Sequence, residues 1–291
     1  VVLLGLEGIA FFTSIPLLQV SIIGIGLGGG ILNGETNALV ADISNEAEKG
    51  SRLSLLGAFY GIGALGIPVL LSFLSEYYSF EIILHGTGMV MLIGILFCLG
   101  IRFPAPKQPQ GFPIKEGLGL LKESSLLLLS FILFFQSGIE GVCNNWTTLY
   151  LGQTTGIPEN RALIALTCMV AGLTVARLLL VVLFKKIKQE TVLRTSLITA
   201  VAGFALLTFA PGFARAAIGM ALIGAGLAST FPVILSIIGS RYASLSGTAF
   251  SVALVIALIG QTLLNRLTGI ISQGYGIVVY PYMMIVSLMI M

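Results

Sequence analysis

The stretch IGIGLG, Ile23 to Gly28, has a counterpart 200 residues later in IGAGLA, Ile223 to Ala228. The next apolar segment of each region continues the similarity, because GSRLSLLGAFYGIGALG from Gly50 loosely matches GTAFSVALVIALIGQTL from Gly247. One glycine match carries little weight, but two successive segments in the same order and at nearly the same offset indicate an internal duplication. We therefore expect two parallel repeats.

The chain as a whole is apolar enough to be embedded in lipid. Hydrophobic residues make up 56% of the 291 residues, charged residues only 9%, and the mean hydropathy is +1.04. Runs of about 20 apolar residues are long enough to cross a bilayer core about 30 Å thick, and continuous runs favour helices over the alternating strands of a barrel. The sequence thus predicts an all-α polytopic membrane protein. After an apolar piece at 1–14, spans are expected at 17–41, 52–75, 82–101, 124–151, 161–184, 191–210, 213–238, 247–272 and 277–291.

The basic residues give the orientation of these spans. Alternate connections contain eleven of the fifteen Lys and Arg, and the opposite connections contain only Arg161 and Arg215. By the positive-inside rule the first set of connections is cytoplasmic.

The longest connection, residues 102–122, is Pro-rich and basic, which is typical of a linker between two bundles. We expect a partial N-terminal bundle at 1–101 and a C-terminal six-helix bundle at 123–291. Subtracting the repeat offset from residue 123 places the start of the first bundle about 75 residues before Val1. The interpretation is an N-terminally truncated twelve-helix protein that begins at the end of its third helix.

Twelve helices in two parallel halves with a basic central loop resemble the major facilitator superfamily of secondary transporters. The segment GIGALGIP, Gly61 to Pro68, resembles the Gly-Pro signature of the fifth helix. The resemblance implies that Gly61, Gly63 and Pro68 allow close helix contact and bending where the halves move. Two further segments are similar to sugar:proton symporters related to the fucose and glucose permeases: GGGILNGETNALVAD, 28–42, and FFQSGIEGVCNNWTTLYL, 134–151.

Glu140 is the candidate for proton coupling. It is expected about 24 Å along its helix, past the middle of the membrane, where an ionisable side chain costs several kcal/mol and is a functional candidate by default. Gln136, Glu140, Asn144 and Thr147 or Thr148 follow at spacings of three and four and share one stripe. A carboxyl group in such surroundings favours its neutral form and can exchange a proton. The alternative is a permanently protonated Glu140 that only hydrogen-bonds Asn144 or a neighbouring helix.

Amides on other spans are candidates for contact with the solute. Asn33 and Asn37 share a face of the fourth helix, whereas Glu35 lies about 200° away from Asn33 and is assigned to a gate or to helix packing. Because Asn33 stands where some of the symporters have a carboxylate, proton coupling through this helix is in doubt.

The eleventh helix repeats the amide pattern with Gln261, Asn265 and Thr268. Amides from several helices suit a polyhydroxyl ligand, since each offers donors and acceptors, although hydrogen bonds between helices are the alternative. Trp146 is expected either to stack on a sugar ring or to anchor the helix at the interface.

Three basic residues in or near spans remain. Arg177 is expected to brace the cytoplasmic gate, because TVARLLLVVLFKKIKQE approximates the superfamily's gate motif but lacks its usual Asp. Arg266 is expected to extend toward the outer membrane surface. His85, at the start of a span, is expected at the interface rather than in a proton relay.

We find no catalytic or metal-binding pattern in the sequence, so no enzyme, metal site or cofactor is expected beyond the proton as coupling ion. The predicted function is proton-coupled transport of a small hydrophilic solute, a sugar, by alternating access. The alternatives are an exporter of drugs or metabolites from the same superfamily and a receptor that binds without transporting. The expected location is the plasma membrane, as a monomer that contacts lipid and solute but no nucleic acid.

Overall fold

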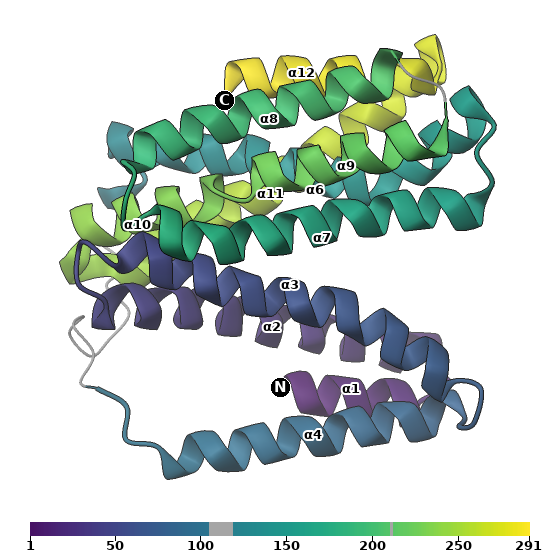
Figure 1. The fold of residues 1–291 in the computed structure, drawn as a ribbon. Helices are drawn as coiled ribbons and strands as arrows, with labels where there is room; N and C mark the ends of the chain where they lie inside the picture. Colours follow the sequence, from purple (N-terminus) through teal and green to yellow (C-terminus); the bar gives the residue numbers. More distant parts are fainter. Residues whose placement is uncertain (105–118, 210–211) are drawn as a thin grey trace. The chain divides into compact units, whose positions relative to one another are not determined.

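Most of the described residues are helical. The computed structural model describes residues 1–104, 119–209 and 212–291, apart from the side chains of Pro68, Val69, Ser72 and Phe209. Seven of its helical segments are long and apolar enough to cross a membrane. The helices are α1 (Val2–Phe11), α2 (Ile15–Ile43), α3 (Lys49–Leu74), α4 (Phe80–Gly100), α6 (Ser124–Thr155), α7 (Glu159–Leu183), α8 (Gln189–Phe209), α9 (Phe213–Leu227), α10 (Thr230–Arg241), α11 (Ser246–Tyr275) and α12 (Tyr280–Ile290), as labelled in Figure 1.

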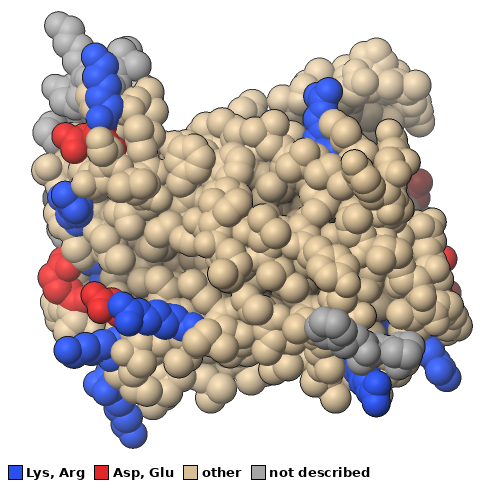
Figure 2. All heavy atoms as spheres, turned by 90° about the horizontal axis from the view of Figure 1, so that it is seen from above, with Lys and Arg blue, Asp and Glu red and all other residues tan. Residues whose placement is uncertain are grey.

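Charged residues make up only 9% of the chain, and few of them lie in the middle of these helices. Figure 2 shows a broad central area without Lys, Arg, Asp or Glu, with most of the charged side chains near the margins. This distribution is the one that a hydrocarbon surrounding favours, because a charge at the bilayer centre is costly. The fold is therefore that of the polytopic helical membrane protein expected from the sequence.

The chain divides into two compact units. The first comprises Val1–Thr36 with Gly66–Gln110, and the second comprises Asn37–Leu65 with Gly111–Met291. The predicted linker 102–122 lies mostly outside the described residues. The predicted bundle boundaries stay a prediction, while the second unit contains helices from both sides of that linker.

In the first unit, small residues allow α1 to approach its neighbour α2. A Cβ on Gly8 of α1 would collide with the Ser21 side chain of α2. The helix α1 also packs against α4, where Gly88 leaves room for the Glu7 side chain. Close approach through small residues is the usual way in which membrane helices associate, because lipid provides little hydrophobic drive.

In the second unit, α6 packs along α11, and α9 packs against both α7 and α8, as the ribbon of Figure 1 also shows. A Cβ on Gly260 of α11 would collide with the backbone of Phe134 in α6. A Cβ on Gly224 of α9 would likewise collide with the backbone of Met169 in α7. These two helix pairs thus meet at backbone distance.

The predicted span 213–238 is confirmed as one apolar segment, Phe213–Arg241, which contains a two-residue turn. The helix α9 ends at Leu227 and α10 begins at Thr230. Pro232 supplies the physical reason, since proline cannot donate to the carbonyl four residues earlier and its ring clashes with that carbonyl, here Ala228. The last predicted span also begins differently, as a short 3₁₀ turn at Ile277–Val279 followed by α12.

Candidate functional site

The polar stripe predicted on α6 divides between the protein interior and exposed surface. Gln136 and Thr147 are fully buried, Glu140 is half-buried and Asn144 is exposed. Thr147 Oγ1 lies 3.0 Å from the Tyr280 hydroxyl of α12. The stripe therefore contributes both to the core and to the surface where a solute could bind.

Gln136 reaches the interruption between α9 and α10. Its Nε2 donates to the main-chain oxygen of Leu227 at 3.1 Å, while its Oε1 is buried and has no hydrogen-bond partner among the described residues. Leu227 is the last residue of α9. Gln136 thus ties α6 to the turn between α9 and α10.

Glu140 has neither a hydrogen bond nor an ion pair from its carboxylate among the residues that the structure describes. Asn144, its expected partner in the alternative interpretation, donates instead to the main-chain oxygen of Glu140 at 3.0 Å. The buried guanidinium of Arg177 interacts with Glu140 electrostatically without pairing with it. The Glu140 side chain is therefore held by no hydrogen bond or ion pair among the described residues.

The amides of α11 meet α6 beside Gly141. A Cβ on Gly141 would lie against the side chains of both Gln261 and Asn265. Asn265 Oδ1 accepts from Asn145 Nδ2 at 2.9 Å and from Trp146 Nε1 at 3.2 Å. Asn265 Nδ2 donates to the main-chain oxygen of Gln261 at 2.7 Å. Thr268, the third member of the predicted pattern, is buried and bonds within its own helix.

Asn145 was missed by the sequence reasoning, which followed only the stripe through Glu140. A second stripe at the same helical spacings was available, since Gly138, Gly141 and Asn145 all face α11. Gly138 and Gly141, followed by Asn145 at helical spacing, are the sequence signal for the close contact between α6 and α11.

The predicted solute contacts of the fourth helix lie on α2. Asn33 and Glu35 are exposed in the first unit, and Asn37 is buried in the second. Both asparagines interact with other groups. The positions of Asn33 and Glu35 are described within the first unit only.

Arg177 connects α7 to the first half of α3. Its Nη1 donates to the Gly57 main-chain oxygen at 3.1 Å, and Ser54 Oγ donates to the Arg177 main-chain oxygen at 2.7 Å. Gly61 faces Thr174 of α7 so closely that a Cβ there would collide with the threonine side chain. Gly63 faces open space, and the Pro68 side chain lies outside the described residues.

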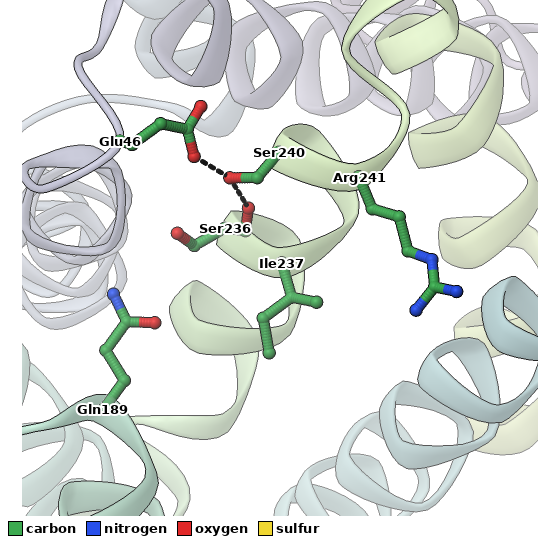
Figure 3. Close-up of a pocket in the computed structure, with 6 residues that line it drawn as sticks. All are labelled: Glu46, Gln189, Ser236, Ile237, Ser240 and Arg241. Carbon is green, nitrogen blue, oxygen red and sulfur yellow. Dashed lines mark hydrogen bonds between the residues drawn. The ribbon is translucent and has the colours of Figure 1, made fainter.

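A second set of contacts joins the α2–α3 connection to α10. Lys49 Nζ is bonded to Glu46 Oε1 at 2.7 Å and to Ser240 Oγ at 3.0 Å, and Ser240 also bonds Glu46 Oε2. Glu46 and Ser240 also line an open pocket of about 450 Å³, and Figure 3 shows their side chains pointing toward each other. Gln189, Ser236, Ile237 and Arg241 complete its lining.

His85 is not isolated in the first unit. Its Nδ1 lies 2.6 Å from Glu7 Oε2 of α1, and its ring lies against Phe11 with centroids 4.9 Å apart. Glu7 was not predicted as the partner of His85, because the two residues are far apart in the sequence and neither belongs to a motif with regular spacing.

Comparisons with known proteins place these helices in a family. The Major Facilitator Superfamily model matches residues 1–290. An uncharacterized transporter of Sinorhizobium fredii is 22% identical over 276 residues, which are 94% of this chain and 72% of the relative.

Solved structures share the fold at low identity. The Escherichia coli fucose:proton symporter FucP is similar with a TM-score of 0.81 at 19% identity, over 99% of this chain and 80% of FucP. A structure of FucP in the outward conformation gives 0.79 at 20%, over 99% and 79% of the two chains. The human organic anion transporter MFSD10 gives 0.77 at 15%, over 99% and 74%. With its interrupted and Gly-packed membrane helices, the chain belongs to the major facilitator superfamily of transporters.

Proposed function

We propose that the protein takes up a small neutral hydrophilic solute, a sugar, together with a proton. The observation that carries the proposal is Glu140, a half-buried carboxylate near the middle of α6 with no hydrogen bond or ion pair among the described residues. Such a group binds a proton when its surroundings disfavour charge and releases it when they change. The fold it shares with a fucose:proton symporter supports this proposal.

The solute is held by amides in this proposal. Asn144 and Gln261 expose carboxamides on α6 and α11, and Asn265 of α11 is half-buried. Each carboxamide offers donors and acceptors, which matches a hydroxyl-rich ligand better than an apolar drug. Gln136, Asn33 and Asn37 are assigned to the same solute pathway. The proton is the coupling ion, no other cofactor takes part, and the protein works as a monomer in the plasma membrane.

Alternating access supplies the movement in this proposal: the bundles 1–101 and 123–291 rock against each other. The contacts of Arg177 and Gly61 between α3 and α7 close the cytoplasmic side. Gly63, Pro68 and Glu35 are assigned to bending and packing of the helices that move.

The test replaces Glu140 by glutamine in the full-length protein reconstituted into liposomes. Glu140→Gln is expected to abolish accumulation of a labelled hexose driven by a proton gradient and to retain counterflow, because the variant still binds and exchanges solute but carries no proton. Glu123→Gln, an exposed carboxylate at the start of the same helix, is the matched control and should accumulate hexose normally. Normal accumulation in Glu140→Gln would remove the coupling role.

A second candidate solute is an organic anion. Arg177 is almost fully buried and makes no ion pair among the described residues, and a buried cation favours an anionic partner. The shared fold includes a human organic anion transporter. Transport of a labelled dicarboxylate but not of hexose by the wild-type protein would favour this candidate, export from loaded vesicles would favour an exporter, and binding without counterflow would favour a receptor.

A further inference from the structure

The hydrogen bonds around Asn265 fix which end of its carboxamide is oxygen. The indole nitrogen of Trp146 can only donate, so the atom 3.2 Å from it is Oδ1. The main-chain oxygen of Gln261 can only accept, so the atom 2.7 Å from it is Nδ2. Both ends agree, and the orientation does not depend on a choice between two amide flips.

The orientation of Asn145 follows from that of Asn265. Because Asn265 Oδ1 accepts, the Asn145 atom 2.9 Å away is its Nδ2. Asn145 Oδ1 is then the opposite end of an exposed carboxamide, and it accepts no hydrogen bond from the described residues.

The donors and acceptors that Asn145 and Asn265 leave unused determine which hydrogen bonds the two amides can offer to a ligand. Asn265 Oδ1 already accepts two hydrogen bonds, which matches its two lone pairs, and Asn265 Nδ2 has one of its two hydrogens left. Asn145 retains a carbonyl oxygen and one N–H. Asn265 is therefore a donor only, and the acceptor of the pair comes from Asn145.

The depth of these amides argues that they face water rather than lipid. Asn145 lies about 8 Å beyond the midpoint of α6, and Asn265 about 7 Å beyond the midpoint of α11, at 1.5 Å per residue. Both depths are within the half-thickness of about 15 Å of a hydrocarbon core. Polar side chains at such depth face a bundle interior or an aqueous cavity, because lipid cannot satisfy them.

We propose that Asn145 Oδ1 and the remaining Asn265 N–H form a subsite for two neighbouring hydroxyl groups of the solute, with Trp146 as the positioning residue. One hydroxyl donates to Asn145 and the next accepts from Asn265. This subsite deepens the proposed function and rests on it, since the ligand class is a neutral polyhydroxyl compound. Trp146 fixes the orientation of the Asn265 carboxamide, because its indole N–H, the only donor of its side chain, bonds to Oδ1.

The first test uses Trp146 as its own reporter, because it is the single tryptophan among the 291 residues. Emission of Trp146 is titrated with neutral aldohexoses and their monodeoxy analogues in purified full-length protein in which every tryptophan outside these 291 residues is replaced by phenylalanine. Asn145→Leu is expected to weaken binding of the preferred hexose by about 3- to 10-fold, as the loss of one or two uncharged hydrogen bonds implies. Gln153→Leu removes another exposed carboxamide of α6, one that makes no hydrogen bond among the described residues; it is the matched control and should bind as the wild type does.

The deoxy analogues distinguish a direct contact from a loss of folding. An analogue that lacks the hydroxyl bound by Asn145 should bind the wild type about 3- to 10-fold more weakly and should be insensitive to Asn145→Leu. If Asn145→Leu weakens every analogue by the same factor, or weakens none, the subsite is wrong. If the wild type responds to no hexose in emission or in counterflow, the sugar proposal itself fails.

Discussion

At the scale of single residues, the second unit contains a buried polar contact whose role is structural. The Tyr280 hydroxyl lies 3.0 Å from Thr147 Oγ1 and 3.3 Å from Cys143 Sγ, and all three residues are buried. A buried hydroxyl is costly without partners, so this contact holds α12 against α6 in one register. Thr147 is accordingly a structural member of the stripe that also contains Glu140.

Replacing that hydroxyl tests the assignment. Tyr280→Phe is expected to lower the free energy of unfolding by about 1–2 kcal/mol, because Thr147 loses a buried partner. The measurement is thermal unfolding in detergent, with Tyr282→Phe, an exposed tyrosine on the same helix, as the control. Equal stability of the two variants would contradict a structural role for the Tyr280 hydroxyl.

At the scale of helices, glycine sets how closely neighbours approach. Gly260 of α11 lies against the Phe134 backbone, whereas Gly274 near the end of the same helix faces open space. The seam between α6 and α11 brings Asn145 and Asn265 within hydrogen-bond distance, so its spacing also decides the geometry of the amides.

These two glycines make a matched pair of variants. Gly260→Ala is expected to cost about 1–3 kcal/mol of stability, because the added methyl group must push two backbones apart. Gly274→Ala should be neutral or slightly stabilising, since alanine favours helix more than glycine does. Detergent melting curves measure both, and a stable Gly260→Ala protein would show that the seam can widen without loss.

The sequence predicts helices better than it predicts their interruptions and contacts. Apolar length alone locates the spans, because every span must cross the same hydrocarbon thickness. The turn between α9 and α10 also has a signal in the sequence, because Pro232 follows it closely. The hydrogen bond from Arg177 to the Gly57 main-chain oxygen has no signal in the sequence, because every residue carries a main-chain carbonyl and nothing marks the one that accepts. The Glu7–His85 pair likewise depends on tertiary proximity.

At the scale of the whole molecule, alternating access requires that contacts on one side of the membrane break as the other side closes. The contacts between the first half of α3 and helices α7 and α10 lie at the predicted cytoplasmic side. Lys49 stands out among them, because its side chain is only 3% exposed and it joins Glu46 to Ser240 of α10. Arg52, three residues later, is 47% exposed and, within the described part of the chain, pairs only with Glu48.

The different burial of Lys49 and Arg52 predicts that replacing each by methionine has different effects. Lys49→Met keeps the volume of the side chain but removes its bonds to Glu46 and Ser240, so it should shift the population toward a state open to the cytoplasm, about tenfold for each 1.4 kcal/mol lost. A cysteine at Ser51, which is buried and bonded to the Val181 main-chain oxygen, reports this opening through its rate of maleimide labelling. In a background without native cysteines, labelling should rise several-fold with Lys49→Met and stay unchanged with Arg52→Met. Because an exposed pair within one helix contributes little to any equilibrium between states, equal acceleration by both variants would mean that general loosening, and not the Lys49 contact, controls cytoplasmic opening.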